Sequence, residues 1–375
     1  MDIEAWRSQM PIVRQYNFLD HAAVGPLSGP AAEAMRRFID EAHHHGCARG
    51  GLFPEAQRVR QLAAKLLHCH AEEVTFVKNT SEGLSFVANG LQFSRGDNIV
   101  TTGVEFPANI YPWMNLRDAG VRLKMVPEDK GRIPLDRLVG LIDERTRVVT
   151  VSSVQFASGY RTDLMTLGRI CQEKGVLFCV DAIQSLGCIP IDVRAMRIDF
   201  LSADGHKWLL GPEGAGLFYC RHELLGLLRP SCVGWACMQD ALNFGEYKLA
   251  FRDDARRFDS GSYNLAGIWG LGASIEWLLN VGVEKIWERV RLLTDRLVQG
   301  VRAKGYRVVG SREAAETSGI VAFVSDTHDH TRLVNHLRQE YRTVIGAREG
   351  RLRVSPHFYN TVEEIDQLIE HLPGH

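Results

Sequence analysis

Lys207 is the residue of this chain whose surroundings most favour covalent chemistry. It closely follows an expected buried strand, stands between His206 and Trp208, and precedes a Gly-Pro turn. Only nine lysines occur among the forty-four basic residues, so lysine is not the usual cation of this chain. A lysine held among apolar and aromatic groups has a lowered amine pKa through desolvation and becomes a nucleophile toward carbonyl carbon. The alternative is a solvated loop lysine with no chemical role.

A second ionisable group, Asp181, follows the all-apolar run Val176–Val180. An aspartate at the carboxyl end of a buried strand is costly to bury unless it has a cationic partner. A protonated pyridine nitrogen is such a partner, and the carboxylate would keep that ring an electron sink. The alternative for Asp181 is a helix N-cap. Lys207 comes one strand later, so both side chains can enter the same crevice.

The segment Phe76–Leu84 passes from an apolar run into a helical pattern through Thr80 and Ser81. Free backbone N–H groups at a helix N-terminus, together with two hydroxyls, favour a phosphate dianion. The chain has no G-x-x-x-x-G-K-[ST] motif and no strand–GxGxxG–helix motif with a following acid. Walker-type nucleotide sites and Rossmann dinucleotide sites are therefore not supported.

Short apolar runs alternate with amphipathic stretches over the first two-thirds of the chain. This alternation predicts an α/β fold with a mostly parallel sheet covered by helices on both faces. Ligands of such sheets lie beyond the carboxyl ends of the strands. The expected strands are 74–77, 98–101, 121–126, 147–151, 176–180, 199–202 and one within 211–219; the expected helices are 55–67, 82–91, 135–142 and 164–174.

The pattern changes after about residue 265, where longer helices and fewer strands follow. The expected helices there are 267–279, 283–304, 330–341 and 361–371, and the expected strands are 306–309, 319–324 and 352–355. We therefore predict a large domain over 21–262 and a smaller α+β domain over 263–375. Residues 1–20 are too few to fold alone and are expected to pack on the small domain.

The composition narrows the function classes further. The 375 residues carry a formal charge of −1, which disfavours nucleic-acid binding by bulk electrostatics. The charged start is unlike a secretion signal, and no apolar run approaches the roughly 18 residues of a membrane span. Eight scattered cysteines without CxxC pairs predict reduced thiols in a cytoplasmic protein.

Three histidine-rich triplets, His43–His45, His68–His70 and His328–His330, raise the question of a metal site. Adjacent residues of a helix point in different directions and seldom converge on one ion. Helically spaced partners, Cys47 for His43 and Glu72 for His68, give only two-ligand pairs. A zinc site needs about three or four ligands, so we predict no metal.

The spacing of Asp181 and Lys207 resembles the spacing of the corresponding residues in a known family. Asp181-x-x-Gln184, followed by Ser202-x-Asp204-Gly205-His206-Lys207-Trp208 and Gly-Pro, is similar to class V, fold-type-I pyridoxal-phosphate enzymes. These form the aminotransferase and cysteine desulfurase superfamily. The resemblance runs from Phe18 to Thr361. It implies pyridoxal phosphate as cofactor and a large domain built on a mostly parallel seven-stranded sheet.

The resemblance also implies roles for residues that match the motifs of the family. Lys207 would hold the cofactor as a Schiff base and move the α-proton of the substrate, and Asp181 would pair with the pyridine nitrogen. Gln184 and Gln155 would lie near the phenolic oxygen of the ring. The phosphate ligands would be Thr80, Ser81 and His206.

Further matches concern the substrate and a second subunit. Arg353 corresponds to the residue that binds the α-carboxylate of the substrate, a task suited to a planar bidentate donor. His21 and Trp235 are additional pocket candidates. Ser262 matches a hydroxyl that members of the family lend to the phosphate of the neighbouring subunit, which implies a homodimer with shared active sites.

The chain departs from the desulfurase pattern at two places that bear on the reaction. The segment 341–351, where desulfurases carry a catalytic thiol, contains no cysteine. Phe106 stands where desulfurases place a histidine that stacks on the cofactor and transfers protons. Phenylalanine can stack but cannot transfer a proton, so Lys207 would be the main acid/base group near Cα. This combination favours transamination of a small amino acid, or epimerisation, over sulfur abstraction.

Two further hypotheses stay open at the level of sequence. One keeps the cofactor and makes the chain a cysteine desulfurase or C–S lyase. The other is a non-catalytic binding protein built on an enzyme fold, although retention of Lys207, Asp181 and Arg353 argues against it. Asp204 is an anomaly, because a hydroxyl residue is common at this position and a second anion would repel the phosphate.

Overall fold

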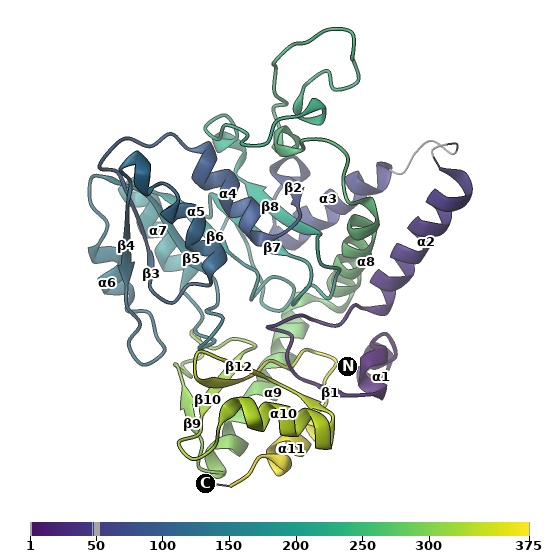
Figure 1. Ribbon diagram of the computed structural model, residues 1–375, viewed down its shortest axis with the longest axis vertical. Helices are drawn as coiled ribbons and strands as arrows, with labels where there is room; N and C mark the ends of the chain where they lie inside the picture. Colours follow the sequence, from purple (N-terminus) through teal and green to yellow (C-terminus); the bar gives the residue numbers. More distant parts are fainter. Residues whose placement is uncertain (1, 47, 49–52, 375) are drawn as a thin grey trace.

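A computed structural model describes residues 2–46, 48 and 53–374, arranged as two stacked parts (Figure 1). The larger part contains a seven-stranded sheet in the order β2-β8-β7-β6-β5-β3-β4. Its strands are β2 (Val74–Val77), β3 (Asn98–Thr102), β4 (Arg122–Val126), β5 (Thr146–Ser152), β6 (Leu177–Asp181), β7 (Phe200–Asp204) and β8 (Gly216–Cys220). All neighbouring pairs are parallel except the two that involve β8.

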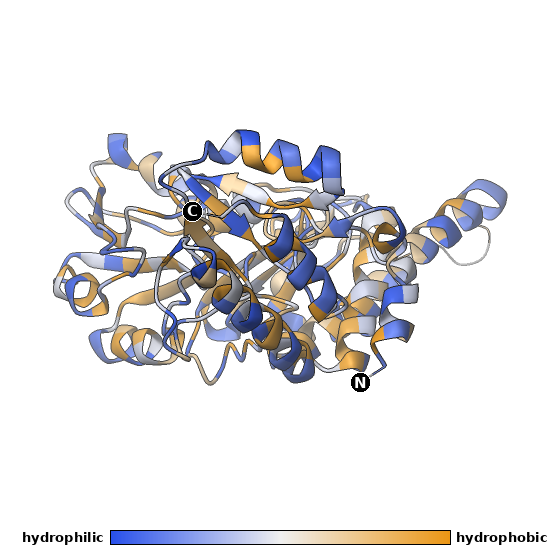
Figure 2. Ribbon diagram, turned by 90° about the horizontal axis from the view of Figure 1, so that it is seen from below, coloured by the Kyte–Doolittle hydropathy of each residue, from blue (hydrophilic) through white to orange (hydrophobic). Residues whose placement is uncertain are grey.

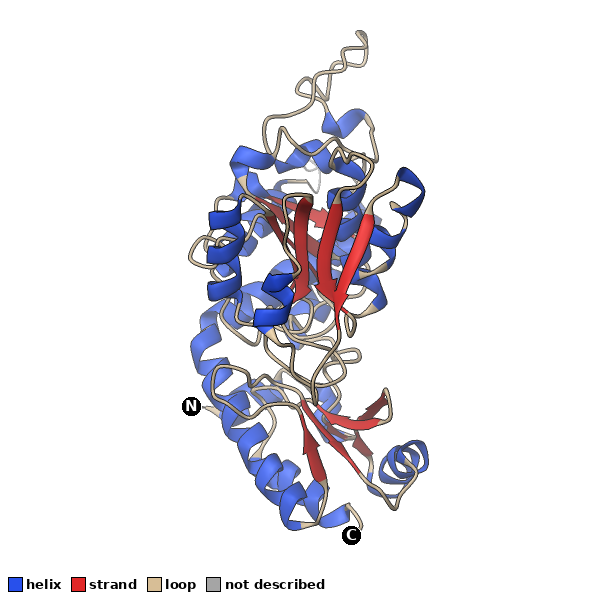
Figure 3. Cartoon of the chain, turned by 90° about the vertical axis from the view of Figure 1, so that its left-hand side faces the viewer, coloured by secondary structure: helices blue, strands red, loops and turns tan. Residues whose placement is uncertain are grey.

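Helices cover both faces of this sheet, as Figure 3 shows for the upper group of strands. One face packs against α3 (Pro54–Leu67), α6 (Leu135–Gly140), α7 (Leu164–Lys174) and α8 (Leu265–Val281), and the other against α4 (Thr80–Gly90) and α5 (Tyr111–Met114). Along β7 the buried residues alternate, with Leu201 in one apolar cluster and Phe200 in the other. This alternation is the period of two expected for a strand. Hydrophobic residues accordingly concentrate in the interior strands (Figure 2).

The smaller part is built on a four-stranded antiparallel sheet of order β12-β13-β10-β9. Its strands are β9 (Arg307–Val309), β10 (Val321–Val324), β12 (Gly346–Arg348) and β13 (Arg351–Val354), and its helices are α9 (Val283–Ala303), α10 (His330–Tyr341) and α11 (Val362–His371). The N-terminal segment lies against this part (Figure 1): β1 (Asn17–Phe18) pairs in parallel with β11 (Thr343–Val344). Short helix α1 (Ile3–Ser8) precedes it.

The division into domains stays a prediction, and the structure adds one detail to it. The predicted boundary at 263 precedes α8, yet α8 packs on α2 (Gly29–His45) and α3, beside the large sheet. Helix α2 was not predicted, because its polar pattern holds only two buried residues, Ala31 and Ala34. Its apolar face, which includes Met35 and Phe38, packs on α8 and stabilises the helix.

The sequence predicted neither a membrane-spanning helix nor a metal site. Within the described residues, no helix is long and apolar enough to cross a membrane, and no group of three acidic, histidine or cysteine side chains is placed to hold a metal. Cys47, considered above as a partner of His43, lies outside the described part of the chain.

Candidate active site

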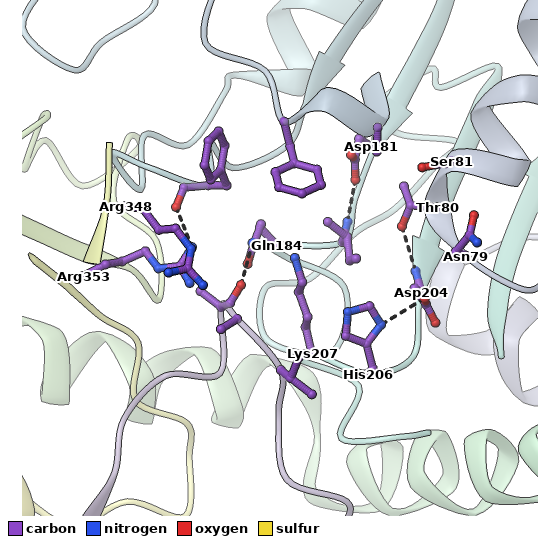
Figure 4. A pocket seen from close by; sticks show the side chains of 17 residues that line it. Asn79, Thr80, Ser81, Asp181, Gln184, Asp204, His206, Lys207, Arg348 and Arg353 are labelled. Carbon is purple, nitrogen blue, oxygen red and sulfur yellow. Dashed lines mark hydrogen bonds and ion pairs between the residues drawn. The ribbon is translucent and has the colours of Figure 1, made fainter. Parts of the chain in front are cut away.

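A cavity of about 290 Å³ lies at the carboxyl ends of β6 and β7, where parallel-sheet topology predicts a ligand site. Figure 4 shows its polar groups in two sets: Asp181, Thr80, Ser81 and Asp204 at one end, and two arginines at the other. The side chain of Lys207 lies between the two sets. The lining residues that carry polar or charged groups are Asn79, Thr80, Ser81, Asp181, Gln184, Asp204, His206, Lys207, Arg348 and Arg353.

Lys207 follows β7 and is buried, with 8% of its surface exposed. Burial lowers the pKa of its amine, an effect that the Asp181 carboxylate opposes and the charge of Arg353 reinforces. The backbone around it is fixed by the N-terminal segment, because Gly25 N–H donates to the His206 carbonyl at 2.7 Å. A Cβ on Gly25 would collide with the Lys207 carbonyl oxygen, so only glycine allows this close approach.

Asp181 ends β6 as a buried carboxylate with one free oxygen. Its Oδ1 accepts a hydrogen bond from Ile183 N at 3.0 Å, whereas Oδ2 has no hydrogen-bond partner among the described residues. Burial raises the pKa of the carboxyl, and the nearby Glu105 raises it further. A buried carboxylate oxygen without a partner is costly, so this position fits a ligand that supplies a cationic N–H group.

The N-terminus of α4 forms the end of the cavity beyond Asp181. Asn79 caps the helix by accepting a hydrogen bond from Glu82 N at 2.9 Å, which leaves Thr80 and Ser81 at the cavity wall. Gly83 brings the helix onto β7, because a Cβ there would collide with Ser202 Oγ. The first turn of an α-helix presents free N–H groups and a positive dipole end, which suits a phosphate.

Asp204 and His206 line the same end of the cavity. Asp204 Oδ1 accepts a hydrogen bond from Gly205 N at 2.7 Å. Its Oδ2 lies 3.0 Å from His206 Nδ1, within ion-pair distance but outside hydrogen-bond geometry. The Asp204 carboxylate, whose charge was expected to repel a phosphate, therefore has a backbone amide and an imidazole as its neighbours.

Arg353, on β13, is buried to 1% exposure at the opposite end. Its Nη1 donates to the Phe156 carbonyl at 3.0 Å, and its Nη2 donates to Asp20 Oδ1 at 3.1 Å. These bonds fix the plane of the guanidinium, and the two nitrogens keep further hydrogens for a ligand. The arrangement suits recognition of a carboxylate.

The structure brings Gln184 and Phe106 to the cavity together with the residues above. Gln184 is held by hydrogen bonds to the Ala22 carbonyl at 3.0 Å and from the Trp208 indole at 2.9 Å. The ring of Phe106 lines the cavity, and its centroid lies 5.5 Å from Lys207 Nζ.

Four predicted site residues do not line the cavity. His21 is fully buried in a ring cluster and bonds to the Ser355 carbonyl and the Tyr359 hydroxyl. Trp235 and Ser262 lie on other surfaces, and Ser262 borders a separate cavity of about 170 Å³. Gln155 is buried behind the cavity wall, where its Nε2 donates to Glu105 at 2.7 Å.

Glu105 and Arg348 are the residues that sequence reasoning missed. Glu105 is buried beside Asp181 and accepts hydrogen bonds from Ser152 N at 2.9 Å, Asn109 Nδ2 at 3.0 Å and Gln155. It anchors the segment that carries Phe106. Its sequence signal is an acid next to Phe106 with an amide four residues later, which in the structure donates to it across a short turn.

The family of the chain follows from comparison with known proteins. A family model described as aminotransferase class-V matches residues 18–368. The chain therefore belongs to the class V aminotransferase family. One relative is a probable cysteine desulfurase of Methanothermobacter thermautotrophicus, 33% identical over 99% of this chain and 98% of its own. Another is an uncharacterized aminotransferase, YcbU, of Bacillus subtilis, 28% identical over 98% and 97%.

Solved structures agree with this assignment. The apo structure of a cysteine desulfurase from Thermococcus onnurineus NA1 superposes with a TM-score of 0.89 at 26% identity, covering 98% of this chain and 96% of that one. The cysteine desulfurase CsdA of Escherichia coli, at 24% identity and a TM-score of 0.88, shows the same fold. The predicted fold type I architecture and the predicted cofactor, pyridoxal phosphate, are confirmed.

The cavity has the groups that this cofactor requires. The unpartnered Oδ2 of Asp181 suits a protonated pyridine nitrogen, and the α4 N-terminus suits the phosphate. Lys207, with its lowered amine pKa, lies between them and the arginines.

Proposed function

We propose that this class V enzyme is an aminotransferase that acts on a small amino acid. The observation that carries the proposal is the position of Lys207, a desolvated amine lying between the acidic end of the cavity and Arg353. Phe106, the aromatic residue over the same space, cannot exchange a proton. Lys207 would therefore both donate and accept the protons that an amino-group transfer moves.

Each remaining group has a role in this proposal. Pyridoxal phosphate, when bound, withdraws electrons from the substrate Cα. Asp181 Oδ2 would accept the N–H of the ring, and Thr80, Ser81 and the α4 amides would bind the phosphate. Arg353 would bind the substrate α-carboxylate, which fixes the Cα–H bond toward Lys207. Lys207 Nζ would accept the substrate α-proton and, as the ammonium group, would donate it in the second half of the amino-group transfer.

A panel of amino acids tests this function. We expect at least one to convert the absorbance of the holoenzyme to that of the aminated cofactor, with release of the matching 2-oxo acid. A 2-oxo acid added afterwards should restore the first spectrum. If every amino acid leaves the spectrum unchanged, transamination is the wrong reaction. Exchange of the α-hydrogen without an aminated cofactor would instead indicate an epimerase.

A second candidate function is cysteine desulfuration or C–S cleavage, because several relatives are named cysteine desulfurases. The segment that would carry the thiol weighs against a persulfide relay. It forms β11 and the tight β12–β13 hairpin, and no cysteine occurs after Cys237. No described cysteine lines the cavity. Release of sulfide with alanine or pyruvate from cysteine would favour this candidate over transamination.

We also propose that the enzyme is a homodimer. Ser262 is exposed and lies outside the main cavity, as expected for a hydroxyl that completes the phosphate site of another subunit. Sedimentation equilibrium should give twice the mass of the chain. A monomer that binds the cofactor at full affinity would rule out a shared site.

A further inference from the structure

Three arginines share one face of the β12–β13 hairpin. In the antiparallel register Gly346 lies opposite Arg353, and Arg348 lies opposite Arg351. Residues directly opposite each other project to the same side of a sheet, and positions two apart in a strand do so as well. Leu352 projects to the other side, into the apolar core of the smaller part. Arg348, Arg351 and Arg353 therefore face the same way.

Two of these arginines have acidic partners. Arg353 Nη2 lies 3.1 Å from Asp20 Oδ1, and Arg351 Nη2 lies 2.5 Å from Glu128 Oε1. Arg348 differs from both. The one hydrogen bond of its side chain in the structure goes from Nη1 to the carbonyl of the preceding residue, Ala347, at 2.8 Å, and no carboxylate of the described chain lies within ion-pair distance.

Arg348 is exposed, and its side chain lines the cavity next to Arg353 (Figure 4). Both arginines lie at the end away from Asp181 and the α4 N-terminus, so they are at the substrate end and not at the phosphate end. Their positive charges act on each other, because Arg348 contributes to the lowered pKa of Arg353. Asp20 is hydrogen-bonded to Arg353, although its carboxylate charge also acts on Arg348. A ligand whose single carboxylate binds Arg353 would leave the Arg348 guanidinium without a carboxylate contact.

We infer that the amino-acid substrate has a carboxylate on its side chain, and that Arg348 binds this second carboxylate while Arg353 binds the first. This inference rests on the proposed function, because it deepens the description of the same site. A guanidinium offers paired donors that match a carboxylate, and two of them at one end of a cavity select a dicarboxylic amino acid over a neutral one.

Binding of unreactive acids to the holoenzyme tests the inference. Succinate and butyrate have chains of equal length and differ in the second carboxylate, and neither carries an amino group. We expect calorimetry to show that the wild-type protein binds succinate at least about tenfold more tightly than butyrate, since a charged hydrogen-bonded pair contributes on this scale. Arg348→Gln should remove most of this preference and leave butyrate affinity unchanged.

Arg351→Gln is the matched control, because Arg351 lies on the same face but does not line the cavity. It should retain the preference for succinate. If Arg348→Gln weakens the binding of succinate and of butyrate equally, Arg348 binds the carboxylate common to both, and the inference is overturned. An unchanged preference in that variant, or its loss in Arg351→Gln as well, would overturn it too.

The test separates this inference from the proposed function. If succinate binds through Arg348 but no amino acid aminates the cofactor, the inference is supported and transamination is refuted. Amination by neutral amino acids, with no preference of the protein for succinate, would refute the inference and leave transamination supported.

Discussion

Replacing Lys207 by alanine is expected to lower the rate of amino-group transfer by about 10³-fold or more. Loss of a general acid–base group alone costs about 10² to 10⁴ in rate. Lys207 is the one lysine that lines the cavity within the described chain, and its burial keeps its amine pKa lowered. Single-turnover measurements with the reactive amino acid should show the loss. The fold should persist, because alanine removes a buried charge and leaves the β7 hydrogen bonds intact.

The control for this substitution is Lys174→Ala, at the exposed end of α7. It should leave the rate unchanged. A small primary amine added to Lys207→Ala should recover part of the rate, because it restores the missing proton-transfer group without restoring any packing. A Lys207→Ala enzyme that turns over at the wild-type rate would contradict the proposed role of this residue.

Asp181→Asn is expected to lower the rate by about 10² to 10⁴-fold. The amide has the same shape, so the bond from Ile183 N to the remaining oxygen can persist. It has no negative charge to hold a proton on the pyridine nitrogen. Breaking a buried ion pair by removing one partner costs about 3–5 kcal/mol, which corresponds to this range of rates.

The measurement for Asp181→Asn pairs single-turnover rates with cofactor affinity from a spectral titration. Asp181→Glu is the comparison, because it keeps the charge and displaces it by one methylene. We expect Asp181→Glu to retain more activity than Asp181→Asn. The opposite order, or a cofactor affinity that neither substitution changes, would show that Asp181 does not hold the ring nitrogen.

The sequence was sufficient to predict the groups that follow directly from strand ends. Asp181 comes directly after an apolar run, Lys207 follows shortly after the end of β7, and Thr80 begins a helix after β2. Because strands of a parallel sheet end at one edge, their following residues meet without any knowledge of side-chain packing. The seven strands of the large sheet were predicted from short continuous apolar runs or from the alternation of apolar and polar residues.

Other residues could not be placed by such local reasoning. His21 lies in a motif that resembles the family, but its ring turns into a buried cluster with Tyr359 and His357. Arg348 reaches the cavity only because the β12–β13 register turns it to the same side as Arg353. A shift of one residue would turn it away, and nothing in the sequence of the hairpin reports that register.

The geometry around Asp204 shows how tertiary contacts resolve an ambiguity in the sequence. Repulsion of a phosphate was expected from its charge. The structure turns one carboxylate oxygen onto Gly205 N and the other toward His206 Nδ1. Neither contact is predictable from residue types, because both depend on the turn that follows β7.

Reduction of the holoenzyme with borohydride, followed by peptide mass mapping, identifies the residue that holds the cofactor. Reduction fixes the cofactor to whichever amine holds it. We predict a single modified peptide that contains Lys207, with the mass of one reduced cofactor, and no such peptide from Lys207→Ala. A label on a different lysine, or no label on protein saturated with pyridoxal phosphate, would show that Lys207 does not hold the cofactor.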